Sequence, residues 1–269
     1  MAADDASMGD LFADPEDYYP PTPPPKTEFY TLSDGRELTL HLVGHSPLEA
    51  HHLWNGSRVV SELFEREPER VRGKTVLELG AGAGLPSLVC GALEAERVVL
   101  TDFPDADLVE VMQKNVDGLE ELVPEARGRV RVKGFIWGGD VKPLAAELGG
   151  AAVEGEGQEG GRFDVLVLAD LLFRHSEHGN MVKTIREALR RGRESTAYVV
   201  FTSYRPWLQH KDLAFFDLAR EAGFVVEKLL EKKLDAPLFE NDPGDLEVQK
   251  TVTGWTVRWP EEACRGAAH

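Results

Sequence analysis

A chain of 269 residues, 42% of them hydrophobic, is long enough to bury a substantial core, and one catalytic domain with terminal extensions is expected. Its 47 acidic and 30 basic residues leave a formal net charge of -17, which disfavours nucleic acid as a partner and favours a cationic one. Two cysteines, Cys90 and Cys264, exclude a disulfide framework and a cysteine zinc site, and no apolar run is long enough to span a membrane. We therefore expect a cytoplasmic protein.

The N-terminal region combines a tail, a hairpin and a helix. Residues 1–26 are acidic and end in prolines, a composition typical of an extended tail that either stays solvated or folds over the active site. The β-rich runs Phe29–Leu32 and Leu38–Val43 flank Asp34-Gly35, a pair that favours a tight hairpin turn. Apolar residues at helical spacing predict a helix over Leu53–Glu65.

From Lys74 onward, short apolar runs alternate with helical segments, which predicts parallel strands covered by helices on both faces. The expected strands are Thr75–Leu79, Val98–Thr101, Val130–Val132, Phe163–Ala169 and Ala197–Thr202. The expected helices are Ser87–Leu93, Asp107–Leu119, Leu144–Leu148, Glu177–Arg190 and Lys211–Ala222.

Two later β-rich runs, Phe224–Leu229 and Val248–Trp259, need no helix between them and predict a terminal antiparallel pair. The fold class is therefore α/β, a seven-stranded, doubly wound, Rossmann-like sheet with an N-terminal β-hairpin extension. The catalytic domain is expected over residues 27–262, with a flexible Gly- and Glu-rich insertion at 149–161 and a short tail at 263–269.

The first strand of the alternating region passes into the glycine loop Gly80-Ala81-Gly82-Ala83-Gly84 and then into a helix. Glycine lets the chain turn sharply and lets a ligand contact main-chain atoms, while the helix N-terminus supplies N–H groups. A nucleotide-like ligand is therefore expected. A dinucleotide fingerprint requires Gly or Ala where Leu85 stands, before Pro86, and an acid at Glu78 is unusual for it. These departures favour a cofactor without phosphates.

Three further residues stand where the neighbouring strands end. Asp102 can accept hydrogen bonds from both hydroxyls of a ribose at the switch point of the sheet. Trp137 either stacks beside an adenine or packs in the core. Asp170 lies at the carboxyl edge, where α/β sheets place their reactive groups.

Taken together, these motifs resemble the seven-stranded methyltransferases that modify protein lysines, and more specifically the fungal nicotinamide N-methyltransferase-like family. The resemblance covers residues 11–259 and rests on several short sequences. They are Leu11-Phe12-Ala13-Asp14-Pro15-Glu16-Asp17, Leu53-Trp54-Asn55, Leu85-Pro86-Ser87, Thr101-Asp102-Phe103-Pro104-Asp105, Ile136-Trp137-Gly138 and Asp170-Leu171-Leu172-Phe173-Arg174-His175. The family is understood to methylate the N-terminal glycine and adjacent lysine of translation elongation factor 1-alpha.

The resemblance implies S-adenosylmethionine as cofactor and a set of residues around it: Trp54, Gly80, Ala81, Gly82, Asp102, Trp137 and Ala169. It also implies that Asp170 and Phe173 line the acceptor channel, as an acid-x-x-aromatic motif. Relatives often carry Tyr at the second place, so Phe173, which has no hydroxyl, is expected only to shape the channel or stack. The implied partner is the basic N-terminus of elongation factor 1-alpha, bound by a monomer.

Several alternatives stay open on the sequence alone. They are a small-molecule N-methyltransferase of the nicotinamide type, a nicotinamide-dependent oxidoreductase, and a non-catalytic binding module that kept the fold. His175, Glu177 and His178 lie close together, as do His51 and His52, but methyl transfer requires no metal. We interpret these histidines as residues of a cleft rim.

Overall fold

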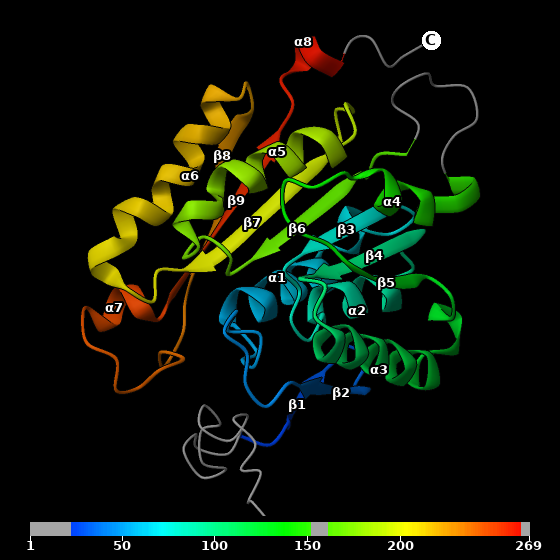
Figure 1. Cartoon of the computed structure of the whole chain (residues 1–269), viewed down its shortest axis with the longest axis horizontal. Coiled ribbons are helices and arrows are strands. Elements are labelled where there is room, and N and C mark those ends of the chain that lie inside the picture. Colours follow the sequence, from blue (N-terminus) through cyan, green and yellow to red (C-terminus); the bar gives the residue numbers. More distant parts are fainter. Residues whose placement is uncertain (1–22, 152–160, 265–269) are drawn as a thin grey trace, which may run out of the picture.

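The computed structural model describes residues 23–151 and 161–264 of the chain (Figure 1). The predicted N-terminal tail and most of the predicted insertion at 149–161 therefore lie outside the described residues, as do residues 265–269. No helix in the described part of the chain is long and apolar enough to cross a membrane.

A seven-stranded sheet runs through the centre of the molecule in the order β5-β4-β3-β6-β7-β9-β8 (Figure 1). Its strands are β3 (Thr75–Leu79), β4 (Arg97–Asp102), β5 (Val130–Gly134), β6 (Val165–Ala169), β7 (Thr196–Thr202), β8 (Val225–Lys233) and β9 (Thr251–Arg258). The first five pair in parallel, whereas β9 pairs antiparallel with both β7 and β8. The predicted α/β sheet and terminal antiparallel pair are confirmed.

The chain order reverses between β3 and β6, because β4 and β5 extend the sheet to one side of β3 and the later strands to the other. The loops after β3 and β6 consequently diverge at the carboxyl edge. Ligands of open α/β sheets bind at such a switch point. This edge is where the candidate site lies.

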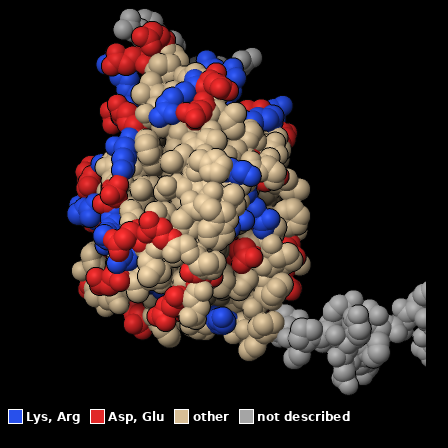
Figure 2. Space-filling view, turned by 90° about the vertical axis from the view of Figure 1, so that its left-hand side faces the viewer, with Lys and Arg blue, Asp and Glu red and all other residues tan. Residues whose placement is uncertain are grey.

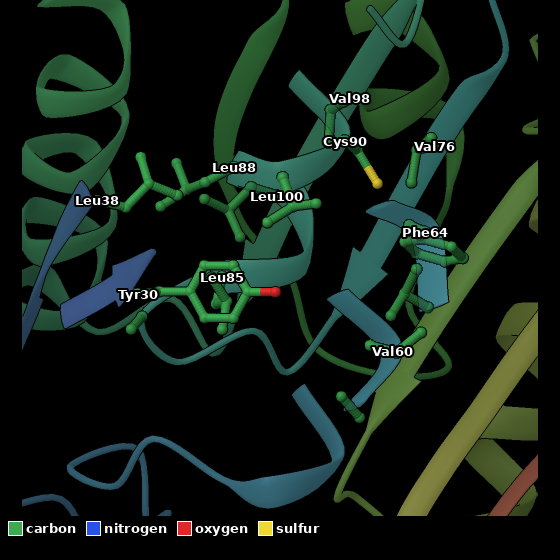
Figure 3. Close-up of a cluster of buried hydrophobic side chains, with 14 of the residues drawn as sticks. Tyr30, Leu38, Val60, Phe64, Val76, Leu85, Leu88, Cys90, Val98 and Leu100 are labelled. Atoms are coloured by element: carbon green, nitrogen blue, oxygen red, sulfur yellow. The ribbon is translucent and has the colours of Figure 1, made fainter. Parts of the chain in front are cut away.

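Helices cover both faces of the sheet, as the alternation predicts. One face is covered by α1 (Asn55–Arg66), α2 (Leu85–Ala92) and α3 (Ala106–Leu122). The other is covered by α4 (Lys142–Ala145), α5 (His178–Ala188) and α6 (Gln209–Glu221). Figure 3 shows the first core, in which side chains from the hairpin, α1 and α2 meet those of β3 and β4.

The predicted hairpin is formed by β1 (Lys26–Thr31) and β2 (Glu37–Leu42), which pair antiparallel. It packs on α3 through Asn115, whose side chain donates to the carbonyl of His41 at 2.9 Å and accepts from its N–H at 2.8 Å. On the other side, the Tyr30 hydroxyl donates to Glu65 of α1 at 2.6 Å. The hairpin is thereby attached to α1 and to α3.

One expectation is wrong. The connection between the last two strands contains a one-turn helix, α7 (Leu246–Gln249), so β9 begins at Thr251 rather than at Val248. Asp245 caps this helix by accepting from the N–H of Glu247 at 2.9 Å. Four residues are too few to show a helical period, which is why the apolar pattern did not reveal it. A second short helix, α8 (Glu261–Cys264), follows β9.

Candidate functional site

A cavity of about 350 Å³ opens at the carboxyl ends of β3, β4 and β6. Its lining combines the glycine loop, the segments that follow these strands and residues 48–57. The cavity brings together every site residue named from the sequence: Trp54, Gly80, Ala81, Gly82, Asp102, Trp137, Ala169, Asp170 and Phe173.

The glycine loop lies against the floor of the cavity and requires its glycines. Gly80, Gly82 and Gly84 all have positive φ, of 58°, 55° and 79°. A Cβ atom on Gly80 would lie 2.6 Å from the Leu171 side chain and 2.8 Å from the Trp137 ring. A side chain at Gly80 would therefore clash with the cavity wall as well as strain the backbone.

Glu78 is buried at the end of β3, with 1% of its surface exposed. Its Oε2 accepts hydrogen bonds from the N–H of Ser87 at 2.9 Å and from the Ser87 hydroxyl at 2.5 Å. Its Oε1 has no partner among the described residues, although Glu78 lines the cavity. Burial raises the pKa of this carboxyl to about 8. The unpaired Oε1 atom can accept a hydrogen bond from an ammonium or N–H group of a ligand.

Asp102 ends β4 with both carboxylate oxygens held by the backbone. Oδ2 accepts from the N–H of Gly82 at 2.7 Å and Oδ1 accepts from the N–H of Phe103 at 2.6 Å. Burial raises the pKa of this carboxyl. The backbone bonds fix the carboxylate at the cavity wall, with lone pairs left for ligand hydroxyl groups.

Apolar side chains form the wall beside Asp102. Phe103 and Ile136 are 44% and 56% exposed, although both are large and apolar, and both line the cavity. Trp137 is half-buried: it lines the cavity and also packs against the core on the α5 side of the sheet. The two interpretations of Trp137 are therefore compatible, and Phe103, Ile136 and Trp137 together offer an apolar wall for an aromatic ligand group.

Asp170 follows β6 with φ of 54°, a left-handed conformation that is unusual for a residue other than glycine. Its carboxylate accepts from the N–H of Thr202 at 2.8 Å, from the N–H of Gly56 and from the Tyr204 hydroxyl at 3.4 Å. Burial raises the pKa of Asp170 to about 7. Asp170 therefore joins β6 and β7 to the N-terminus of α1, where Trp54 itself provides no side-chain cap.

Aromatic rings surround Trp54 beside Asp170. The Trp54 ring stacks on Phe173 with 5.6 Å between centroids and an interplanar angle of 22°. Tyr204 and Phe239 meet its edges at 5.0 and 5.8 Å. The Arg174 guanidinium lies 5.4 Å from the centre of the Phe173 ring. We call Trp54, Phe173, Tyr204 and Phe239 the aromatic cluster.

Sequence reasoning singled out Glu78 at the start of the cofactor loop but assigned it no contact of its own, and it did not include Tyr204 or Phe239 among the site residues. Tyr204 and Phe239 lie in connections far along the chain from Trp54, and only the fold brings their rings together.

The histidines expected at the rim have different partners. The His175 ring nitrogen Nε2 lies 2.7 Å from the buried Asp212 carboxylate, and His178 Nε2 lies 2.7 Å from the carbonyl of Leu172. Among the described residues, the potential ligand atoms of Glu49, His51 and His52 lie within 4.8 Å of one another. Of the four histidines interpreted as rim residues, His52 lines the cavity together with Glu49, whereas His51, His175 and His178 do not line it. The rim interpretation is wrong for His178, which is buried, because its ring packs beneath the cleft against Phe215.

Known proteins match this chain over most of its length. The family model described as lysine methyltransferase matches residues 33–222. The chain is 60% identical over 264 residues to the protein N-terminal and lysine N-methyltransferase EFM7 of Gibberella zeae, covering 97% of this chain and 98% of that one. It is 59% identical over 266 residues to the protein of that name from Neurospora crassa, covering 98% and 93%. Identity to the Schizosaccharomyces pombe protein is 39% over 264 residues, covering 97% and 99%.

Solved structures resemble the fold at much lower identity. A chain described as a SAM-dependent methyltransferase from Streptococcus mutans superposes with a TM-score of 0.54 at 12% identity, covering 89% of this chain and 56% of that one. A transferase from Pyrococcus horikoshii superposes with a TM-score of 0.51 at 14% identity, covering 87% and 72%. These likenesses concern the arrangement of strands and helices.

Proposed function

Because this chain belongs to the lysine methyltransferase family and is an S-adenosylmethionine-dependent protein methyltransferase, we propose that it methylates the N-terminal glycine and the adjacent lysine of translation elongation factor 1-alpha. The carrying observation is a single cavity lined by the glycine loop and Asp102 and also by Asp170 and the stacked rings of Trp54 and Phe173. The net charge of -17 suits a basic polypeptide as acceptor. We further propose that the enzyme acts as a monomer in the cytoplasm.

The residues of the cavity fit the cofactor. Bound S-adenosylmethionine supplies an electrophilic sulfonium methyl group. The free Oε1 of Glu78 would accept from the cationic amino group of its methionine part, and Asp102 would accept from its ribose hydroxyls. The backbone of Gly80, Ala81 and Gly82 admits close approach, because these residues leave the cavity floor open. The remaining contacts are assigned to Trp54, Trp137 and Ala169.

The other end of the cavity is assigned to the acceptor amine. Asp170 contributes a buried carboxylate that attracts the cationic amine, and Phe173 and Trp54 present ring faces for a cation–π contact. The amine must lose its proton before it attacks. A terminal α-amine, with a pKa of about 8, loses it more readily than a lysine at about 10.4. The enzyme's main tasks are then to align the neutral lone pair and to exclude water.

Mass spectrometry of purified elongation factor 1-alpha, incubated with the enzyme and S-adenosylmethionine, tests the proposal. We expect mass gains in steps of one methyl group, mapped to the N-terminal glycine and the next lysine. An Asp102→Ala variant, which lacks the ribose-binding carboxylate, serves as the inactive control. An unchanged mass would refute the substrate, and turnover of nicotinamide offered in a parallel reaction would support the small-molecule alternative.

A further inference from the structure

The connection between β8 and β9, residues 234–250, reaches across to the acceptor end of the cavity. Its ring, Phe239, lies 5.0 Å from His52, 5.8 Å from Trp54 and 5.6 Å from Tyr204, measured between centroids, and meets all three edge to face. Phe239 does not itself line the cavity. Any influence on a bound acceptor therefore passes through Trp54 and His52, which do line it.

This connection follows a defined path. The N–H of Leu234 donates to the carbonyl of Lys250 at 2.8 Å and closes its base. The buried Gln249 side chain donates to the carbonyl of Tyr204 at 3.2 Å and to that of Pro243 at 2.9 Å. Gln249 thus attaches the connection to the segment that carries Tyr204. The connection that carries Phe239 is therefore closed at its base and attached through Gln249.

The charged side chains of the connection between residues 234 and 249 are all acidic. No Lys or Arg occurs between residues 234 and 249, whereas five acids do: Asp235, Glu240, Asp242, Asp245 and Glu247. Glu247 forms ion pairs with Lys233 and Lys250. Glu240 and Asp242, which follow Phe239 in the chain, are exposed to solvent. Carboxylates beside an aromatic wall suit a cationic polypeptide.

We propose that the β8–β9 connection is an acceptor-recognition element, in which Phe239 acts as a positioning residue for the Trp54 wall and Glu240 and Asp242 attract the basic chain around the acceptor amine. The inference rests on the proposed function, since it assigns a partner to the same cavity. The ring contacts of Phe239 are with His52, Trp54 and Tyr204 and not with the glycine loop or Asp102, so the connection is expected to affect acceptor binding more than cofactor binding.

Steady-state methylation of an N-terminal elongation factor 1-alpha peptide tests this role with three variants. Phe239→Leu, which keeps apolar volume but loses the ring, should raise the KM for the peptide at least fivefold and change kcat less. Phe239→Tyr, which keeps the ring, should restore the KM to within twofold of the unchanged enzyme. Leu246→Ala is the matched control, because Leu246 is 51% exposed in the same connection and outside the cluster.

Cofactor affinity is measured in parallel by calorimetry and should stay within twofold in all three variants. A Glu240→Gln, Asp242→Asn double variant should also raise the KM for the peptide and weaken its dependence on salt. Equal KM values for Phe239→Leu and Leu246→Ala, or an equal loss of cofactor affinity in Phe239→Leu, would overturn the inference while leaving the proposed function standing. A lack of methyl transfer by the unchanged enzyme would instead overturn the proposed function, and the inference with it.

Discussion

Glu78 and Asp170 are both buried carboxylates, and burial raises their pKa values to about 8 and about 7. They differ in how their oxygens are used. Asp170 accepts from three protein donors, whereas Oε1 of Glu78 has no partner within the described residues. Glu78 is therefore the carboxylate with an oxygen left for a direct hydrogen bond from a ligand, whereas Asp170, whose oxygens are held by the protein, is left to act on the acceptor amine through its charge.

The affinity for S-adenosylmethionine should depend on pH through Glu78. Below pH about 8 the Glu78 carboxyl in the free enzyme is largely protonated, and a cationic ligand favours the ionised form. Affinity should therefore rise as pH approaches 8, with release of a proton on binding. Calorimetry at pH 7 in two buffers of different ionisation enthalpy measures that proton. In Glu78→Gln the release at this site should vanish; the same release in both proteins would contradict the assignment.

Asp170 should make the free energy of unfolding depend on pH. Its native pKa of about 7 exceeds that of an unfolded aspartate, so its contribution to stability is complete below pH about 4 and is lost as pH rises through 7. Denaturant unfolding of Asp170→Asn should accordingly show a weaker decline between pH 5 and 8 than the unchanged enzyme. The variant should also lose about 1–3 kcal/mol in free energy of unfolding, because an amide has one acceptor oxygen where the carboxylate has two, and its NH2 group would face a donor. Parallel pH curves would argue against this account.

At the scale of single elements, the start of α1 depends on a residue from a distant strand end. Gly56 donates its N–H to Asp170, 114 positions later in the chain. A Cβ on Gly56 would lie 2.6 Å from both Asp170 Oδ2 and the carbonyl of Val200. The closeness of these three elements explains a glycine in the first turn of α1, where helix propensity alone favours alanine.

This contact predicts opposite changes in stability for two Gly→Ala substitutions. Gly118, exposed in the middle of α3, has no atom within 4 Å of a built Cβ, so Gly118→Ala should stabilise the protein by about 0.5–1 kcal/mol. Gly56→Ala should destabilise it by about 1–3 kcal/mol and lower methyl transfer, because Asp170 must move. Thermal unfolding and activity of both variants check the contrast. Two equal stabilisations would show that the α1 contact is unimportant.

At the scale of the whole molecule, the excess of acid is not gathered into one patch on the face shown in Figure 2, where Lys and Arg lie among Asp and Glu. Long-range attraction then comes from the net charge of -17 and from local groups such as the β8–β9 connection. Screening shortens such attraction to about 8 Å at physiological salt.

Ionic strength should therefore act on acceptor binding. Raising salt from about 0.02 to 0.3 M should increase the KM for a basic protein acceptor several-fold and leave kcat nearly unchanged. Initial-rate measurements across this range test it, with an acceptor peptide whose basic residues are replaced by glutamine, apart from the methylated lysine, as the control. An equal salt response for both peptides would mean that charge does not steer the acceptor.

Much of the fold was predictable because buried parallel strands are continuous apolar runs: β3 has the predicted bounds, Thr75–Leu79. The glycine loop and Asp102 were predictable for a related reason, since both follow directly from a recognisable strand. The one-turn helix α7 was not, and neither was the part of Phe239 in the aromatic cluster.

Local sequence by itself determined the alternation of strands and helices in the core and the turn chemistry of the loop after β3, since each depends on neighbouring residues. Only the tertiary structure decided that Asp170 caps α1, that Glu78 keeps a free oxygen at the cavity and that Phe239 supports Trp54. These contacts join residues far apart in the chain, and sheet closure and helix packing set their distances.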